Sequence, residues 1–157
     1  MNEENSNYYS KNFNTNNKNS YTNLSSEQIF ELELYKRRLL ALYLFSISSV
    51  LSFKSTFKGI DLIYKNEENS NEELVPTYFG LIAEIISVIA KLILLNNAII
   101  RYKNLYFLHL QGKITYSLQP NLDFIYANIT SLVSSLYVLR GILSIINRSI
   151  DEPILGV

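Results

Sequence analysis

The chain has 157 residues, the size of a single domain. Its 14 Lys and Arg residues balance 14 Asp and Glu residues, and charged residues make up only 18% of the chain, against roughly 25% in an average soluble domain. The absence of cysteine excludes disulfides and thiolate chemistry, and the zero net charge offers no basic field to a nucleic acid.

The first segment, residues 1–24, consists mostly of Asn, Ser, Tyr, Lys and Thr and has almost no aliphatic side chains. Such a segment cannot bury enough apolar surface to offset the entropy that ordering would cost. We therefore expect residues 1–24 to be a disordered tail ahead of a helical body over residues 25–157. No apolar run follows the N-terminus, so we expect no cleavable signal peptide.

The first helix is expected over residues 26–65. Ser25 and Gln28 have the spacing of a capping box, which marks its start. From Leu39 onward, apolar or small residues recur at alternating intervals of four and three, the pattern of a coiled-coil seam. The seam positions of this helix are Leu39, Tyr43, Ser46, Val50, Phe53, Phe57, Ile60 and Tyr64. The polar, acidic stretch Lys65–Glu73 predicts a loop.

A second helix is expected over residues 76–111 and a third over residues 120–150. Pro76 suits a first helical turn and Gly112 suits a C-terminal cap. The second seam consists of Val75, Phe79, Ile82, Ile86, Ile89, Ile93, Asn96 and Ile100. The third, which is the most regular, consists of Leu122, Ile125, Ile129, Leu132, Leu136, Leu139, Leu143, Ile146 and Ile150.

The hydrophobic periods are helical throughout, and no segment alternates like a half-buried strand. Short loops make consecutive helices antiparallel neighbours. We therefore expect an all-α fold, an up-down-up antiparallel bundle of three long helices with a disordered N-terminal tail. A break near Asn104 would instead give four helices.

The faces outside the seams are also apolar. The first helix has no charge from Leu39 to Phe53, and the third has none from Phe124 to Leu139. The second is apolar nearly all round, apart from a narrow polar stripe formed by Thr77, Gly80, Glu84, Ser87 and Lys91. Three helices in one bundle cannot each be enclosed on every side, so some of this surface must meet lipid, a second copy or another protein.

Two functions account for the surplus apolar surface. The first is a cytoplasmic, non-enzymatic structural or interaction protein that forms a homo-oligomer or docks partner helices. The alternative is a small three-span integral membrane protein, a pore or accessory subunit with a cytoplasmic N-terminus. Basic residues at Lys36–Arg38, Arg101 and Lys103 favour the alternative. Charges inside the apolar runs, and charge-free stretches shorter than the roughly 20 residues of a span, favour the first.

Six polar residues are candidates for a structural polar cluster: Lys54, Lys58, Glu84, Lys91, Asn96 and Arg140. If the first two helices fold back on each other, Glu84 lies opposite Lys54 and Lys58, which predicts a structural ion pair. A proton or ion relay is the alternative if the helices span a membrane. Arg140 either joins this cluster or extends outward, and Asn96 is expected to fix helix register or oligomeric state.

His109 is the single histidine of the chain. No cysteine or clustered carboxylate lies at metal-ligand spacing around it, so we interpret it as a surface or interface residue. No nucleotide loop, nucleophile elbow or paired catalytic carboxylates occur in the sequence. We therefore expect no catalytic residue, no cofactor, no metal and no small-molecule substrate.

Overall fold

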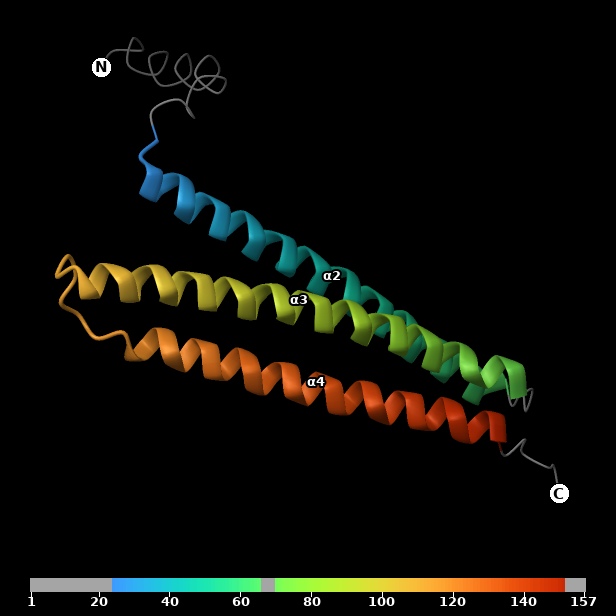
Figure 1. Cartoon of the computed structure of the whole chain (residues 1–157). Coiled ribbons are helices and arrows are strands. Elements are labelled where there is room, and N and C mark those ends of the chain that lie inside the picture. The colour runs from blue at the N-terminus through green and yellow to red at the C-terminus, as the bar shows by residue number, and fades with distance from the viewer. Residues whose placement is uncertain (1–23, 66–69, 152–157) are drawn as a thin grey trace, which may run out of the picture. The chain divides into compact units, whose positions relative to one another are not determined.

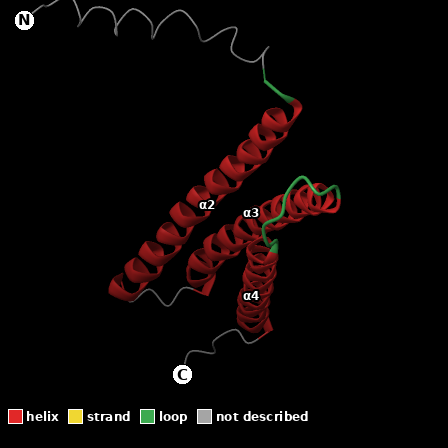
Figure 2. Ribbon diagram, turned by 90° about the vertical axis from the view of Figure 1, so that its left-hand side faces the viewer, coloured by secondary structure: helices red, strands yellow, loops and turns green. Residues whose placement is uncertain are grey.

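A computed structural model describes residues 24–65 and 70–151. They form three long helices, α2 (Ser26–Lys65), α3 (Ser70–Leu110) and α4 (Gln119–Asp151) (Figure 1). No strand occurs in the described part of the chain (Figure 2). The all-α prediction with three long helices is therefore confirmed, and α3 runs through Asn104 without a break. The tail predicted for residues 1–24 lies, apart from Leu24, outside the described residues.

The chain divides into two units, Met1–Tyr35 and Lys36–Val157, and the boundary falls within α2. The first unit contains the start of α2, where the predicted capping box is formed. The backbone N–H of Ser25 donates to Gln28 Oε1 at 2.9 Å, and the backbone N–H of Gln28 donates to Ser25 Oγ at 3.2 Å. These two bonds satisfy donors that a first helical turn leaves without helical acceptors.

In the second unit, α2 and α3 run antiparallel. Ser48 of α2 bonds to Ala83 of α3, and Ser55, one heptad later, bonds to Pro76, one heptad earlier. α3 and α4 also lie side by side in opposite directions (Figure 1). The three helices of this unit therefore run up, down and up, as predicted from the short connections.

The start of α3 differs from its predicted position. The helix begins at Ser70, so Pro76 lies inside it and part of the expected loop Lys65–Glu73 is helical; residues 66–69 lie outside the described residues. Pro76 is the seventh residue of α3, beyond the first turn, where a proline removes one hydrogen bond of the helix. The prediction that began the helix at Pro76 therefore placed the start of α3 about two turns too late.

The end of α3 is as predicted. Gly112 has a φ of +69°, in the left-handed region that glycine adopts without steric cost. Its N–H donates to the carbonyl of His109 at 3.0 Å, and the N–H of Lys113 donates to the carbonyl of Leu108 at 3.0 Å. This pair of bonds is a Schellman motif, which satisfies two carbonyls at the end of the helix.

The interior contains small side chains rather than large ones. Among the described residues, the buried hydrophobic side chains are Leu34, Ala41, Ala83, Ala90 and Ile146, and the buried polar ones are Ser48, Ser87 and Ser135. The cores of soluble domains are instead dominated by Leu, Ile, Val and Phe. Six of these eight side chains are alanine or serine, so the helix backbones approach one another closely.

The predicted seam of α2 is wrong as a packing face within this chain. Leu39, Phe53 and Phe57 are 68%, 66% and 67% exposed, and every other seam position from Tyr43 to Tyr64 is also exposed. The inward positions are Ala41, Ser48 and Ser55. The heptad period was correct but its phase was not, because the large side chains mark the outward face and the small ones the inward face.

The other two seams are wrong in part. On α3, Ile82 and Ile89 are exposed, whereas Ala83, Ser87 and Ala90 are buried. On α4 the predicted seam contains both buried and exposed positions. Ile125, Leu132, Leu139 and Ile146 are partly or fully buried, and Ile129, Leu136 and Leu143 are exposed.

Candidate functional site

The contact between α2 and α3 is built from small residues and backbone. Ser48 Oγ donates to the carbonyl oxygen of Ala83 at 2.8 Å, and Ser55 Oγ donates to that of Pro76 at 2.7 Å. A side chain as short as serine reaches the backbone of another helix only where the two helices are close. A Cβ added to Gly80 would lie 3.6 Å from Ser55 Oγ, which is ordinary van der Waals contact.

The contact between α3 and α4 contains a charge. The ammonium of Lys91 donates a hydrogen bond to Ser135 Oγ. Ser135 is only 2% exposed, and Lys91 is partly buried. The side chain of Lys91 therefore crosses to α4 rather than extending into the surroundings of α3.

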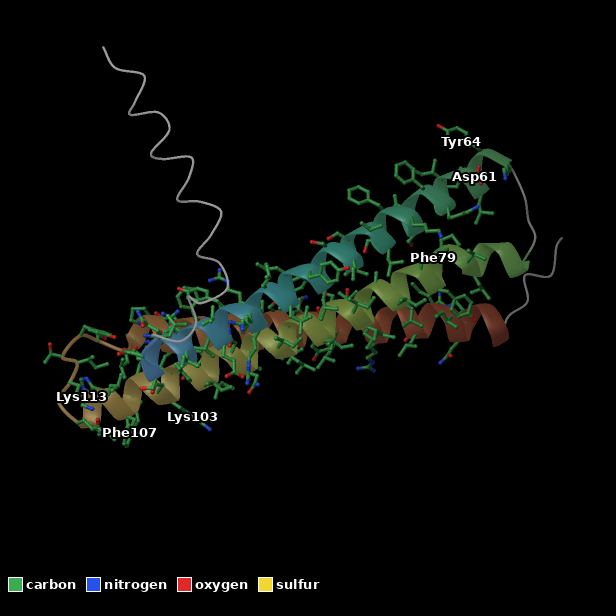
Figure 3. The ribbon with its side chains drawn as sticks, turned by 90° about the horizontal axis from the view of Figure 1, so that it is seen from above. Asp61, Tyr64, Phe79, Lys103, Phe107 and Lys113 are labelled. Carbon is green, nitrogen blue, oxygen red and sulfur yellow. The ribbon has the colours of Figure 1, made fainter. Side chains whose placement is uncertain are left out.

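Lys54 and Lys58 make contacts other than the predicted ion pair with Glu84. The ammonium of Lys54 lies over the ring of Phe79, 4.4 Å from its centroid, which joins α2 to α3 by a cation–π contact. Lys58 Nζ lies 3.9 Å from Asp61 Oδ2 on the same helix. Figure 3 shows Asp61 near the end of α2 and Phe79 on α3.

Glu84, Asn96 and Arg140 differ in exposure. Glu84 is partly buried, and Asn96 and Arg140 are exposed. Within residues 24–65 and 70–151, no ion pair joins Glu84 to Lys54, Lys58 or Arg140. The contacts of Lys54, Lys58 and Lys91 thus lie at separate places along the helices, and a register-fixing role for Asn96 stays a prediction.

Sequence reasoning noted Ser48, with Ser52 and Thr56, as small residues typical of closely packed membrane helices, but it missed Ser135 and the repeat that the inward residues of α2 form. Ser48 and Ser135 carry interhelical hydrogen bonds, and the Oδ1 atom of Asn97, next to the predicted Asn96, is buried. A signal was present, because small residues recur every seven positions at Ala41, Ser48 and Ser55. The large residues beside them have the same period and were given more weight.

The described residues contain no group of three or more His, Cys, Asp or Glu side chains that could hold a metal ion. His109 is exposed near the end of α3. A hollow of about 600 Å³ lies on the surface of α2 and is open rather than enclosed. It is lined by Lys36, Leu39, Leu40, Leu42, Tyr43 and Ser46. Because one helix supplies all six side chains, this hollow is part of the surface of α2 rather than a pocket between helices.

The outward faces are the most distinctive feature of the described chain. Three helices, Ser26–Lys65, Leu74–Leu110 and Gln119–Arg148, are long and apolar enough to cross a membrane. In the most apolar stretch of each, only 11–17% of the residues are buried. The candidate functional surface is therefore this outward apolar side, together with the small-residue contacts behind it.

The end of the second unit where α3 joins α4 is basic and aromatic. It includes Arg101, Lys103 and Lys113, with the rings of Tyr102 and Tyr106 stacked at a centroid distance of 6.0 Å. Figure 3 shows Lys103, Phe107 and Lys113 together at this end. The connection between α2 and α3, at the opposite end of α3, is acidic by sequence, with four glutamates and one lysine in residues 65–73.

Comparison of the chain with models of known protein families, with curated protein sequences and with solved structures found no match.

Proposed function

We propose that this chain is a non-enzymatic, three-span integral membrane protein in which α2, α3 and α4 cross the bilayer and their large apolar side chains face lipid. The observation that carries the proposal is the inverted distribution of side chains. Alanine and serine occupy the helix contacts, whereas leucine, isoleucine and phenylalanine point outward. Lipid provides no hydrophobic driving force between helices, so small residues that allow close packing replace large ones at membrane helix contacts.

Water is a poor environment for the same arrangement. Apolar surface removed from water contributes roughly 25 cal/mol per Å², and most of that gain is absent while side chains such as Phe53 and Tyr137 are about two-thirds exposed. A lone soluble bundle would thus gain little hydrophobic stabilisation from its most exposed large side chains. A bilayer covers the outward faces without requiring a second protein.

The hydrogen bond of Lys91 reduces the main objection to a membrane location. A lysine at the centre of a span costs roughly 2.5–3.5 kcal/mol on the insertion scale, and such residues usually face the interior of a bundle. Lys91 bonds to the buried Ser135 of α4 rather than facing outward. Arg140 is exposed, and its long aliphatic stem allows the guanidinium to extend toward the headgroups.

The charge distribution supports one orientation. The basic end with Arg101, Lys103 and Lys113 would lie on the cytoplasmic side, because cytoplasmic flanks of spans are enriched in Lys and Arg. The cluster Lys36–Arg38, which precedes the charge-free part of α2, belongs to the same side. Tyr102 and Tyr106 would then lie at the level of the headgroups, where tyrosine is enriched.

A soluble homo-oligomer is the second candidate function. It is favoured by the exposure of Lys54, Lys58 and Arg140, which lie on the same helices as the apolar stretches. In that case a second copy, rather than lipid, would cover the outward faces. The biological role in both cases is an interaction or accessory function, because the helix contacts carry packing groups and no catalytic set.

Membrane fractionation distinguishes these two functions. We expect the tagged full chain to sediment with membranes, to stay in the pellet after high-salt and alkaline carbonate washes, and to require detergent for release, because lipid covers its outward faces. Recovery in the supernatant as a discrete oligomer in plain buffer would contradict the membrane proposal and support the second candidate.

A substitution at one exposed position sharpens the test. Ile89→Arg should strongly reduce the amount of carbonate-resistant protein, because a charge facing lipid costs about 3 kcal/mol on the insertion scale. Ile89→Val is the matched control and should behave like the unaltered chain. Unchanged carbonate-resistant yields of Ile89→Arg would count against a lipid-facing α3.

A further inference from the structure

The outward strip of α2 differs from the corresponding seams of α3 and α4, because every one of its positions is exposed. The strip consists of Leu39, Tyr43, Ser46, Val50, Phe53, Phe57, Ile60 and Tyr64. Its four aromatic side chains are all about two-thirds exposed or more, and Tyr64 points away from α3 in Figure 3. The seams of α3 and α4 are divided between buried or partly buried positions and exposed ones, and their exposed apolar members, such as Ile89 and Leu136, are less than half exposed.

The strip also keeps a strict repeat. Its positions alternate in steps of four and three over 26 residues, from Leu39 to Tyr64. A period of 3.5 residues keeps a row of side chains facing one partner helix, because it follows the supercoil of two packed helices. Contact with fluid lipid places no such requirement on the spacing. The seams of α3 and α4 keep the same period and are partly buried between helices. The period of the strip is therefore that of a helix-packing face, and no helix of this unit covers it.

We propose that the strip on α2 packs against the same strip on a second copy of the chain, forming a parallel homodimer within the membrane. This inference rests on the proposed function, since copies inserted with one topology have parallel α2 helices. A two-fold axis along the membrane normal then places each strip residue near its counterpart, as in an isologous interface. Phe53 and Phe57 would each meet the same ring of the other copy.

The area of the strip matches what a dimer requires. Aromatic side chains bury roughly 150–250 Å² each, so four rings that are about two-thirds exposed offer roughly 500 Å². Leu39, Val50 and Ile60 are also exposed and raise the total to roughly 700–800 Å², near the 800 Å² or so that each partner contributes to a standard interface. No charge from Leu39 to Phe53 opposes self-pairing.

The absence of cysteine allows a direct test by single-cysteine cross-linking of the full chain in isolated membranes. Ser46→Cys, Val50→Cys and Phe53→Cys place a thiol in the strip. Ser52→Cys places one on α2 outside the strip, and Tyr137→Cys places one on an exposed position of α4. Ser46→Cys and Ser52→Cys form a matched pair, since both are nearly isosteric changes at exposed positions of one helix.

Under mild oxidation, we expect the strip variants to give about tenfold more disulfide-linked dimer than Ser52→Cys and Tyr137→Cys, because a disulfide forms only where the Cα atoms come within roughly 7 Å. Equal cross-linking at strip and control positions, or none at the strip, would overturn the dimer.

The fractionation result shows whether a failure of the dimer also contradicts the proposed membrane function. Carbonate-resistant protein without strip cross-links means that lipid covers the strip, which removes the dimer and keeps the three-span proposal. Strip cross-links in protein that stays in the supernatant mean that copies pair in water, which removes both the three-span proposal and the membrane dimer.

Discussion

α3 contacts its two neighbours through different chemistry. Toward α2 it presents alanine, glycine and backbone carbonyls, which accept bonds from the hydroxyls of Ser48 and Ser55. Toward α4 it extends the charged side chain of Lys91 to the buried Ser135. The first contact has no charge in its two interhelical hydrogen bonds, whereas the second includes one long charged side chain within an extended helix contact. The comparison shows that one helix can be held by close backbone approach on one side and by a charged side-chain hydrogen bond on the other.

The two contacts therefore respond differently to mutation. Adding volume should harm the α2–α3 contact most, because small side chains set the distance between the backbones. Removing a polar group should harm the α3–α4 contact most, because a charged donor would lose its partner. Three substitutions test this difference. For each variant, the protein in mild detergent is unfolded by added SDS, and the near-ultraviolet circular dichroism of its tyrosines reports the loss of structure.

The largest effect is expected for Ala83→Leu. Ala83 is 2% exposed beside Ser48, so a leucine there forces α2 and α3 apart and should lower the free energy of unfolding by about 3 kcal/mol. Ile82→Leu, at the neighbouring exposed position, is the control and should leave it unchanged. Equal stability of the two variants would show that the helices are not in close contact at Ala83.

A smaller loss is expected for Ser135→Ala. This change removes the acceptor of the Lys91 ammonium, and hydrogen bonds to charged groups contribute about 2 kcal/mol. Ser134→Ala alters the adjacent exposed serine and should change stability by less than about 0.5 kcal/mol. If both variants unfold at the same SDS fraction, the Lys91–Ser135 bond contributes nothing to the α3–α4 contact.

The smallest loss is expected for Ser48→Ala. The hydroxyl of Ser48 bonds to a backbone carbonyl, and a neutral hydrogen bond of this kind contributes about 1 kcal/mol or less in a membrane protein. Ser49→Ala, at an exposed position, is the matched control. A loss for Ser48→Ala as large as that for Ser135→Ala would remove the distinction between the two contacts.

Local features of the chain were predictable because they depend on neighbouring residues. The capping box of Ser25 and Gln28 and the left-handed glycine at Gly112 follow from short-range hydrogen bonding and backbone sterics. The start of α3 was less predictable, because the position of one proline limits a helix without determining where it begins.

Which face of each helix points inward could not be predicted in the same way. Large apolar residues indicate the core of a protein in water but point outward where the surroundings are apolar, so an apolar strip does not identify its own partner. The candidate polar residues show the same limit, since Lys54 lies over the ring of Phe79 and Lys91 bonds to Ser135. Each of these partners is distant in sequence, and no local pattern connects them.

The amino-acid sequence by itself determined the class of fold, the number of helices, the caps at the start of α2 and the end of α3, and the excess of apolar surface, because these depend on periodicity, composition and local bonding. Only the tertiary structure decided which face of each helix is inward. That choice depends on how closely two backbones can approach, and side chains as small as those of Ala41, Ser48 and Ala83 allow the closest approach.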